Sequence, residues 1–187
     1  MIHYDPQLLF MLYGISEVGL GVFKRAKGGT KVTDRGTLGM LWAVLITAIF
    51  CAIFIAKAWP HYQVAFSGAV YDVAVLLFLC GIALRWWAII HLGRFFTVNV
   101  AISVDHRIVD DGPYTYLRHP SYTGALLAFI GLGMMLFNWL AAVVLIVPIL
   151  FAFLWRIAIE EQALLAAFGA DYVAYQRRTK RLVPFLY

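Results

Sequence analysis

Charged residues are scarce in this chain of 187 residues. Aspartate, glutamate, lysine and arginine together make up 13% of the sequence, whereas 63% of it is hydrophobic. Soluble domains carry about 25% charged residues, and a chain this short cannot bury so large an apolar surface inside itself. The scarcity of charge excludes an ordinary soluble enzyme. It predicts an integral membrane protein whose apolar surface is covered by lipid.

Several kinds of site also lack the residues they need. The two cysteines, Cys51 and Cys80, lie inside apolar runs, where a thiol is usually a small buried hydrophobic group. His61 and His91 have no metal-ligand spacing to other ligand residues, so we expect no metal site. No glycine-rich phosphate loop is present. The net charge of +5 comes from sparse basic residues, which fits contact with anionic membrane lipids and argues against nucleic acid.

The chain does contain a series of long apolar runs. A helix needs roughly 17–25 residues to cross the apolar core of a bilayer. Five runs predict transmembrane helices: Leu8–Phe23, Leu38–Ala58, Val64–Leu92, Ser121–Phe137 and Trp139–Ile159. Asn138 alone separates the last two, so we expect them to form a tight helical hairpin. The predicted fold is all-α, a single membrane domain over 1–187, with three spans in 1–92 and two spans plus a C-terminal amphipathic segment in 93–187.

Basic residues are concentrated in alternate connections between these runs. They follow the first run, separate the third from the fourth, and follow the fifth: Lys24, Arg25, Lys27, Lys31, Arg35, Arg94, Arg107, Arg118, Arg177, Arg178, Lys180 and Arg181. Short loops rich in lysine and arginine stay in the cytoplasm. Five spans therefore predict an N-terminus outside and a C-terminus in the cytoplasm. The compact size and the lack of an organelle signal favour a prokaryotic inner membrane.

The segment 106–122 is rich in polar and turn-forming residues. Pro120 fits the first turn of the fourth predicted helix, so Arg118 and His119 lie where free backbone N–H groups favour an anion. Tyr114, Tyr116 and Tyr122 offer flat faces for an aromatic or adenine ring. These residues indicate a pocket for a ligand that carries a carboxylate. A snorkelling arginine within an interfacial aromatic belt explains the same residues equally well.

A second polar cluster lies at the end of the fifth run and contains Arg156, Glu160 and Glu161. Arg156 and Glu160 are four residues apart, so they share one face of a helix. Charged groups beside lipid are costly unless they are paired or face a water-filled site, which makes them candidate functional residues. The alternative is a surface ion pair at the end of a helix.

Taken together, the motifs resemble the isoprenylcysteine carboxyl methyltransferase family, including its bacterial and archaeal members. The resemblance covers roughly residues 92–187. The matching elements are His106-Arg-Ile-Val109, Gly112-x-Tyr114, Arg118-His-Pro-Ser-Tyr122, Arg156-x-x-x-Glu160-Glu161, Phe168-Gly-x-x-Tyr172-x-x-Tyr175 and Arg181-Leu-Val-Pro184. It implies that 93–187 is a catalytic region whose cytoplasmic segments fold over S-adenosyl-L-methionine. The cofactor residues implied are His106, Arg107, Ile108, Val109, Tyr114, His119, Tyr122 and Glu160, with Glu160 suited to the methionyl ammonium.

The resemblance also implies that Arg156 binds the carboxylate of a lipophilic substrate, including a prenylated one. A carboxylate acceptor needs no general base, because the sulfonium already activates the methyl group and catalysis can come from positioning. A phospholipid amine or a thiol acceptor would need a base, for which Glu161 and His119 are candidates. A membrane reductase and a non-catalytic scaffold or transporter are the remaining alternatives. The sequence leaves the acceptor and the oligomeric state open.

Overall fold

The computed structural model describes residues 6–23, 31–32, 36–65, 67–96, 101–102 and 107–184. Six helices account for most of the described chain: α1 Pro6–Phe23, α2 Thr37–Ala58, α3 Gly68–Leu92, α4 Pro120–Met135, α5 Trp139–Phe168 and α6 Ala170–Arg178. Three short 3-10 helices join them: η1 Pro60–Tyr62, η2 Gly93–Phe95 and η3 Gly112–Thr115. Strands β1 Lys31–Val32 and β2 Ala101–Ile102 pair antiparallel. The predicted helical fold is confirmed.

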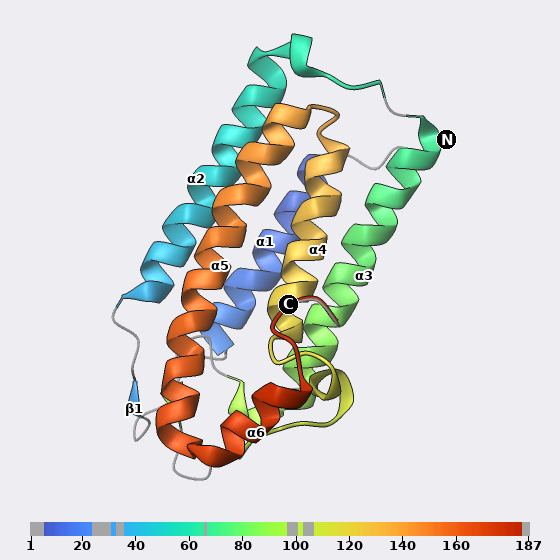
Figure 1. Ribbon diagram of the computed structural model, residues 1–187. Helices are drawn as coiled ribbons and strands as arrows, with labels where there is room; N and C mark the ends of the chain where they lie inside the picture. Colours follow the sequence, from blue (N-terminus) through green and yellow to red (C-terminus); the bar gives the residue numbers. More distant parts are fainter. Residues whose placement is uncertain are drawn as a thin grey trace.

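The five long helices lie side by side in a bundle, with α4 packed against α3 and α5, and α2 packed against α5 (Figure 1). Successive long helices run in opposite directions. As a result, the segment between α3 and α4 and helix α6 come together at one end of the bundle, the lower end in Figure 1. The short turn between α4 and α5 lies at the other end.

Contact between α3 and α4 depends on glycines that let the two backbones touch. A Cβ atom on Gly124 would lie 2.5 Å from the backbone nitrogen of Arg85 and 2.5 Å from the carbonyl oxygen of Gly81. One on Gly131 would lie 2.5 Å from the carbonyl oxygen of Ala74. Small residues at such positions allow close helix packing in membranes. This packing holds the start of α4 directly against Arg85.

The turn between α4 and α5 is fixed by Asn138. Its Oδ1 accepts a hydrogen bond of 3.0 Å from the backbone nitrogen of Ala141, which caps the first turn of α5. Its Nδ2 donates a hydrogen bond of 3.0 Å to the carbonyl oxygen of Trp59. Residues 136–138 are therefore enough to reverse the chain, and the two helices form a hairpin.

Three helical segments are long and apolar enough to cross a membrane: Thr37–Ala58, Gly68–Phe95 and Trp139–Phe168. Large apolar side chains are exposed along the sides of the bundle, among them Phe50, Phe54, Leu76, Ile90 and Phe151. Helix α4 is apolar but has 16 residues. These features support an integral membrane protein, and the count of five spans stays a prediction.

The helices differ from the predicted spans mainly at two boundaries. Helix α3 begins at Gly68 and not at Val64, because Gln63 pairs with Asn138 in an isolated bridge and Val64 donates its backbone N–H to Phe137. Helix α5 continues beyond Ile159 to Phe168. The apolar run ends earlier than the helix, so Glu160 and Glu161 are helical residues. The basic residues Lys24, Arg25, Lys27 and Arg35 lie outside the described residues.

Candidate active site

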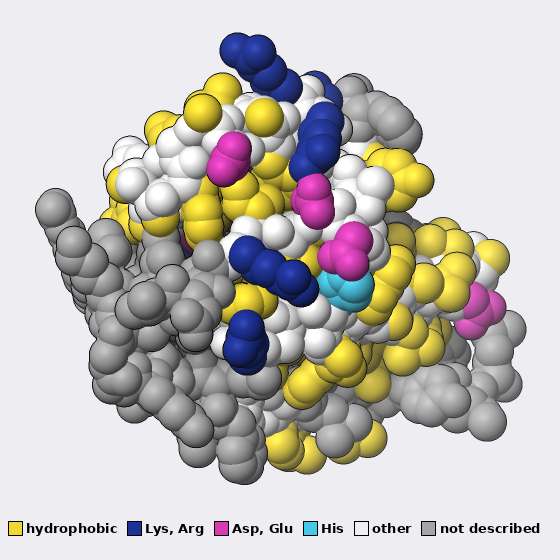
Figure 2. All heavy atoms as spheres, turned by 90° about the horizontal axis from the view of Figure 1, so that it is seen from below, with side chains coloured by type: hydrophobic (Ala, Val, Ile, Leu, Met, Phe, Trp, Pro, Cys, Tyr) yellow, Lys and Arg dark blue, Asp and Glu magenta, His cyan; other side chains and the backbone are white. Residues whose placement is uncertain are grey.

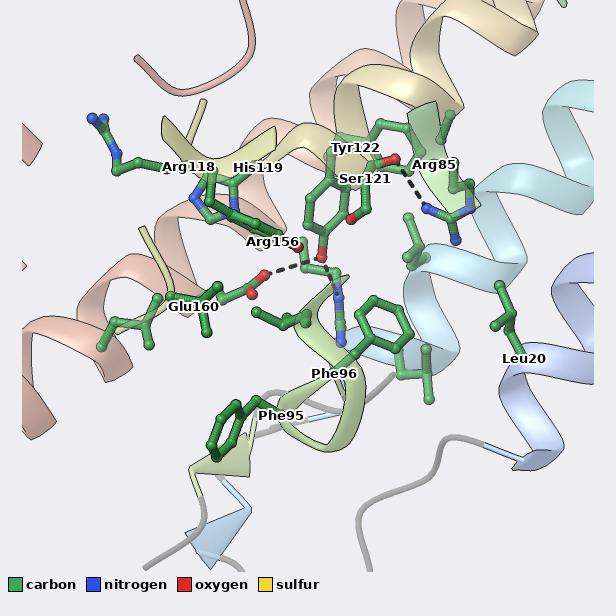
Figure 3. Close-up of a pocket in the computed structure, with 18 of the residues that line it drawn as sticks. Leu20, Arg85, Phe95, Phe96, Arg118, His119, Ser121, Tyr122, Arg156 and Glu160 are labelled. Atoms are coloured by element: carbon green, nitrogen blue, oxygen red, sulfur yellow. Dashed lines mark hydrogen bonds between the residues drawn. The ribbon is translucent and has the colours of Figure 1, made fainter. Parts of the chain in front are cut away.

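A cavity of about 160 Å³ lies at the polar end of the bundle (Figure 3). Its wall includes residues of all six helices and of the segment 107–109 that precedes η3. Seen from that end, lysine, arginine, acidic and histidine side chains gather on the surface of the bundle (Figure 2). The inner wall is largely apolar, with Leu41, Phe129 and Phe153 among its members. The cavity can therefore hold a ligand that has both charged and apolar parts.

A chain of hydrogen bonds links Arg156, Tyr122 and Glu160 inside this cavity. The Nε atom of Arg156 donates to the hydroxyl oxygen of Tyr122 at 3.1 Å, and that hydroxyl donates to Oε2 of Glu160 at 3.2 Å (Figure 3). The Nη1 atom of Arg156 donates to Oγ1 of Thr37 at 2.6 Å. Arg156 is 3% exposed. The four-residue spacing on α5 thus places a guanidinium and a carboxylate side by side in the cavity, held apart by a phenol.

Glu161 is the next residue of α5 and is not among the residues that line the cavity. Its Oε1 accepts a hydrogen bond of 2.7 Å from Nε of Arg118, and its Oε2 accepts one of 2.9 Å from Nε of Arg181. His119 Nε2 lies 3.5 Å from the same Oε1, which is too far for a good hydrogen bond. Two arginines therefore hold this buried carboxylate in the wall behind the site.

The chain after α6 binds the segment that carries Arg118 and His119. The backbone nitrogen of Arg118 donates to the carbonyl oxygen of Lys180 at 2.7 Å, and that of His119 donates to the carbonyl oxygen of Arg181 at 3.2 Å. The side chain of Arg118 also donates to the carbonyl oxygen of Thr179 at 2.6 Å. The start of α4 is thereby fixed by a segment about 60 residues further along the chain.

Tyr114 and the residues before it form another part of the wall. Tyr114 is buried, its hydroxyl donates to the carbonyl oxygen of Ala88 at 3.3 Å, and its own carbonyl oxygen accepts a hydrogen bond of 2.8 Å from Tyr175. Burial raises the pKa of Tyr114, so the phenol stays protonated. Ile108 and Val109 line the cavity beside it.

A hydrogen bond and an ion pair hold this segment at the surface. Nε2 of His91 lies 2.8 Å from Oδ1 of Asp111, and Arg178 of α6 pairs with Asp110. The hydrogen bond from His91 keeps the pKa of Asp111 below its ordinary value. Gly112 has φ +57°, and a Cβ atom there would lie 2.7 Å from the His91 ring. Glycine is therefore needed where the segment crosses α3.

Two polar atoms in the cavity wall have no hydrogen-bond partner among the described residues. They are Nε2 of His119 and the hydroxyl of Tyr172. Both residues are buried, with 4% and 2% exposure, and both line the cavity. Buried polar atoms are nearly always hydrogen-bonded, and an exception needs a reason. A polar ligand in the cavity would supply one.

The structure brings together most of the residues that the sequence predicts for the site. The predicted residues that line the cavity are Arg107, Ile108, Val109, Tyr114, His119, Tyr122, Arg156 and Glu160. Glu161 lies behind the wall. His106 lies outside the described residues. Across the chain as far as it is described, no cluster of three or more histidine, cysteine, aspartate or glutamate residues could hold a metal ion.

The sequence interpretation missed an ion pair between α1 and α3. Arg85 donates hydrogen bonds to both carboxylate oxygens of Glu17, and its Nη1 donates to the carbonyl oxygen of Ser121 at 3.1 Å. Both side chains are 13% exposed and line the cavity. The sequence does contain a signal for this pair. Glu17 and Arg85 are ionisable residues inside apolar runs, and such residues usually mark a functional or paired position.

The chain is similar in sequence to several known proteins. The sequence profile of the isoprenylcysteine carboxyl methyltransferase (ICMT) family matches residues 74–166. A protein-S-isoprenylcysteine O-methyltransferase of Schizosaccharomyces pombe is 32% identical over 140 residues, 73% of this chain and 59% of the relative. Protein-S-isoprenylcysteine O-methyltransferase B of Arabidopsis thaliana is 33% identical over 147 residues, 67% of this chain and 75% of the relative.

A solved structure is also similar. It is that of a eukaryotic intramembrane Ras methyltransferase, an isoprenylcysteine carboxyl methyltransferase, with a TM-score of 0.60 and 28% sequence identity. The match covers 77% of this chain and 52% of that one. The chain therefore spans little more than half the length of this structure, and 59% of the Schizosaccharomyces relative.

Proposed function

The chain belongs to the isoprenylcysteine carboxyl methyltransferase family, and we propose that it transfers a methyl group from S-adenosyl-L-methionine to the carboxylate of a lipophilic molecule. A prenylated molecule is one such substrate. The main support is that hydrogen bonds link Arg156, Tyr122 and Glu160 in one cavity at the polar end of a membrane bundle. The Arg156 guanidinium is a cation for the acceptor, and the Glu160 carboxylate is an anion for the cofactor. The two lie within a few ångströms of the same phenol.

The residues of the cavity fit the cofactor. Glu160 offers a carboxylate to the methionyl ammonium, a charge-assisted contact that is strong in a partly dry site. Nε2 of His119 and the hydroxyl of Tyr172 are buried polar atoms that lack a partner among the described residues. Ile108, Val109 and Tyr114 offer an apolar and aromatic surface for the adenine ring. His106 and Arg107 complete the set that the family resemblance implies.

Arg156 would hold the acceptor. Its guanidinium is buried and lines the cavity, and arginine binds carboxylates through paired N–H donors. Tyr122 and Thr37 accept hydrogen bonds from Nε and Nη1, so the orientation of the guanidinium plane is fixed before the substrate arrives. Such positioning lowers the entropy cost of bringing the acceptor oxygen to the methyl carbon.

The cofactor, when bound, supplies a methyl group on a positively charged sulfur. Leu41, Phe129 and Phe153 in the cavity wall keep water away from that region and offer an apolar surface to a lipid chain. No proton has to be removed from a carboxylate acceptor. Glu161 is already held by Arg118 and Arg181, and we assign it the role of positioning Arg118 and His119.

An amine or thiol acceptor would need a base in contact with the substrate. Of the two candidates predicted from the sequence, His119 lines the cavity and Glu161 does not. A methylated product that resists mild base would therefore point to an amine or thiol acceptor and to His119 as the base.

We further propose that the cavity opens to the cytoplasm, with the N-terminus outside. The segment before α4, the end of α5 and α6 share one end of the bundle (Figure 1), and they carry Arg107, Arg177, Arg178 and Lys180. Basic segments of this kind stay in the cytoplasm. The prokaryotic inner membrane expected from the sequence stays a prediction.

Calorimetric titration of the protein in detergent tests whether it binds the proposed cofactor. We expect saturable binding of S-adenosylmethionine and S-adenosylhomocysteine, and none of NADPH. Binding of NADPH without either sulfur ligand would favour the reductase alternative. Glu160→Ala should abolish binding of both sulfur ligands, because their ammonium group would enter a partly buried site without a counter-charge.

A further inference from the structure

Tyr172 is a buried tyrosine of α6 whose hydroxyl has no hydrogen-bond partner among the described residues. The residue is 2% exposed and lines the cavity. Leaving a buried hydroxyl without a partner costs free energy that a phenylalanine in the same place would avoid. The hydroxyl is therefore explained more readily by a contact made when a ligand occupies the cavity.

Tyr175, one turn further along α6, is a tyrosine of the same helix whose hydroxyl does form a hydrogen bond. Its hydroxyl donates to the carbonyl oxygen of Tyr114 at 2.8 Å. The two rings lie with centroids 6.0 Å apart. Tyr175 thus fastens α6 to the segment before α4, and this leaves the position of Tyr172 well defined without any contact from its own hydroxyl.

The electrostatic surroundings indicate which kind of ligand atom the hydroxyl meets. Burial raises the pKa of Tyr172, and the carboxylates of Glu161 and Glu160 raise it further, whereas Arg118 lowers it. The phenol is thus protonated and can donate its proton to an acceptor. Glu161 is engaged by Arg118 and Arg181, and Glu160 accepts from Tyr122. Neither carboxylate is hydrogen-bonded to the Tyr172 hydroxyl, so a ligand in the cavity can supply the acceptor.

We propose that the hydroxyl of Tyr172 donates a hydrogen bond to the methionyl carboxylate of the cofactor. The inference rests on the proposed function, in which Glu160 binds the ammonium on the same carbon atom. Glu160 and Tyr172 then hold the two charged groups of one amino acid. Tyr172 is a specificity residue for the amino-acid end of the cofactor.

Tyr172→Phe tests this assignment, because it removes the hydroxyl and keeps the ring. We expect the affinity for S-adenosylhomocysteine to fall about tenfold to a hundredfold, the usual effect of losing a hydrogen bond to a charged group. The affinity for 5′-methylthioadenosine, which lacks the amino acid, should not change. The melting temperature without ligand should stay the same or rise, since no hydrogen bond of the described protein is lost.

Tyr175→Phe is the matched control. It breaks the bond to Tyr114, so it should lower the melting temperature of the ligand-free protein. Unchanged binding of S-adenosylhomocysteine by Tyr172→Phe would overturn the inference. An equal loss of 5′-methylthioadenosine binding would also overturn it, as would a melting temperature lowered as much as in the control. Failure of the parent protein to bind either compound would instead contradict the proposed function.

Discussion

Arg85 on α3 donates two hydrogen bonds to the carboxylate of Glu17 on α1, with Nε 2.5 Å from Oε1 and Nη2 2.5 Å from Oε2. The third contact of the guanidinium, from Nη1, reaches the carbonyl oxygen of Ser121 in the first turn of α4. One side chain therefore joins three helices at the wall of the cavity. Ser121 precedes Tyr122, so this junction also sets the position of the phenol between Arg156 and Glu160.

Removing one member of this pair should destabilise the protein strongly. Glu17→Ala leaves the largely buried guanidinium of Arg85 without its counter-charge, which typically costs about 3–5 kcal/mol. Thermal unfolding in detergent, followed by circular dichroism, measures the effect. Asp72→Ala is the control, because Asp72 is an exposed residue of the same helix α3 and its loss should change stability by less than about 0.5 kcal/mol. Equal effects of the two variants would contradict a structural role for the pair.

Arg156→Ala should separate catalysis from cofactor binding. The guanidinium is assigned to the acceptor, so we expect turnover to fall at least about a hundredfold, because an unpositioned acceptor loses the entropic advantage of the site. Titration with S-adenosylhomocysteine should give nearly the parent affinity. Arg177→Ala, at an exposed position of α6, serves as the control with parent activity. Full turnover by Arg156→Ala on a carboxylate acceptor would refute the assignment.

Glu161→Ala should act through stability and not through a proton transfer. The substitution leaves Arg118 and Arg181 without their shared carboxylate. It should cost about 3–5 kcal/mol, because the Arg118 guanidinium is buried and loses its counter-charge. Weaker cofactor binding should accompany it, because the start of α4 loses a support. A variant Glu161→Gln that folds with parent stability, binds the cofactor normally and yet has no turnover would instead identify Glu161 as a catalytic base.

Gly124→Ala should force α3 and α4 apart. The added Cβ atom would lie 2.5 Å from backbone atoms of Arg85 and Gly81, which cannot move as a flexible side chain does, and overpacking of this kind costs about 1–3 kcal/mol or more. Gly14→Ala in α1 is the matched control, since no described atom beyond its own stretch of helix lies within 4 Å of its added Cβ. There, helix propensity predicts a gain of about 0.5–1 kcal/mol. Unfolding temperatures of the two variants should move in opposite directions.

The sequence predicted those parts of the site that depend on local spacing. Arg156 and Glu160 share a helix face because four residues make about one turn. Glu161 was counted among the candidate bases, yet it is not among the residues that line the cavity. Arg118 and His119 were placed at a helix start by Pro120. These inferences needed only helical geometry and the positions of a few residues.

Contacts between distant segments could not be predicted in this way. Glu17 and Arg85 are 68 residues apart, and nothing in either apolar run says which helix is its neighbour. The same holds for the bond between Arg118 and the carbonyl oxygen of Thr179. The unpartnered hydroxyl of Tyr172 is a further case, because burial and the absence of a nearby acceptor are properties of the folded chain.

Transfer of tritium-labelled methyl from S-adenosylmethionine to a prenylated cysteine with a free carboxylate tests the central claim most directly. The purified protein should incorporate label that mild base releases as methanol, since the product is an ester, and the Arg156→Ala variant should incorporate almost none. Label that resists base, or no transfer by protein that binds the cofactor, would contradict a carboxyl methyltransferase acting on this class of substrate.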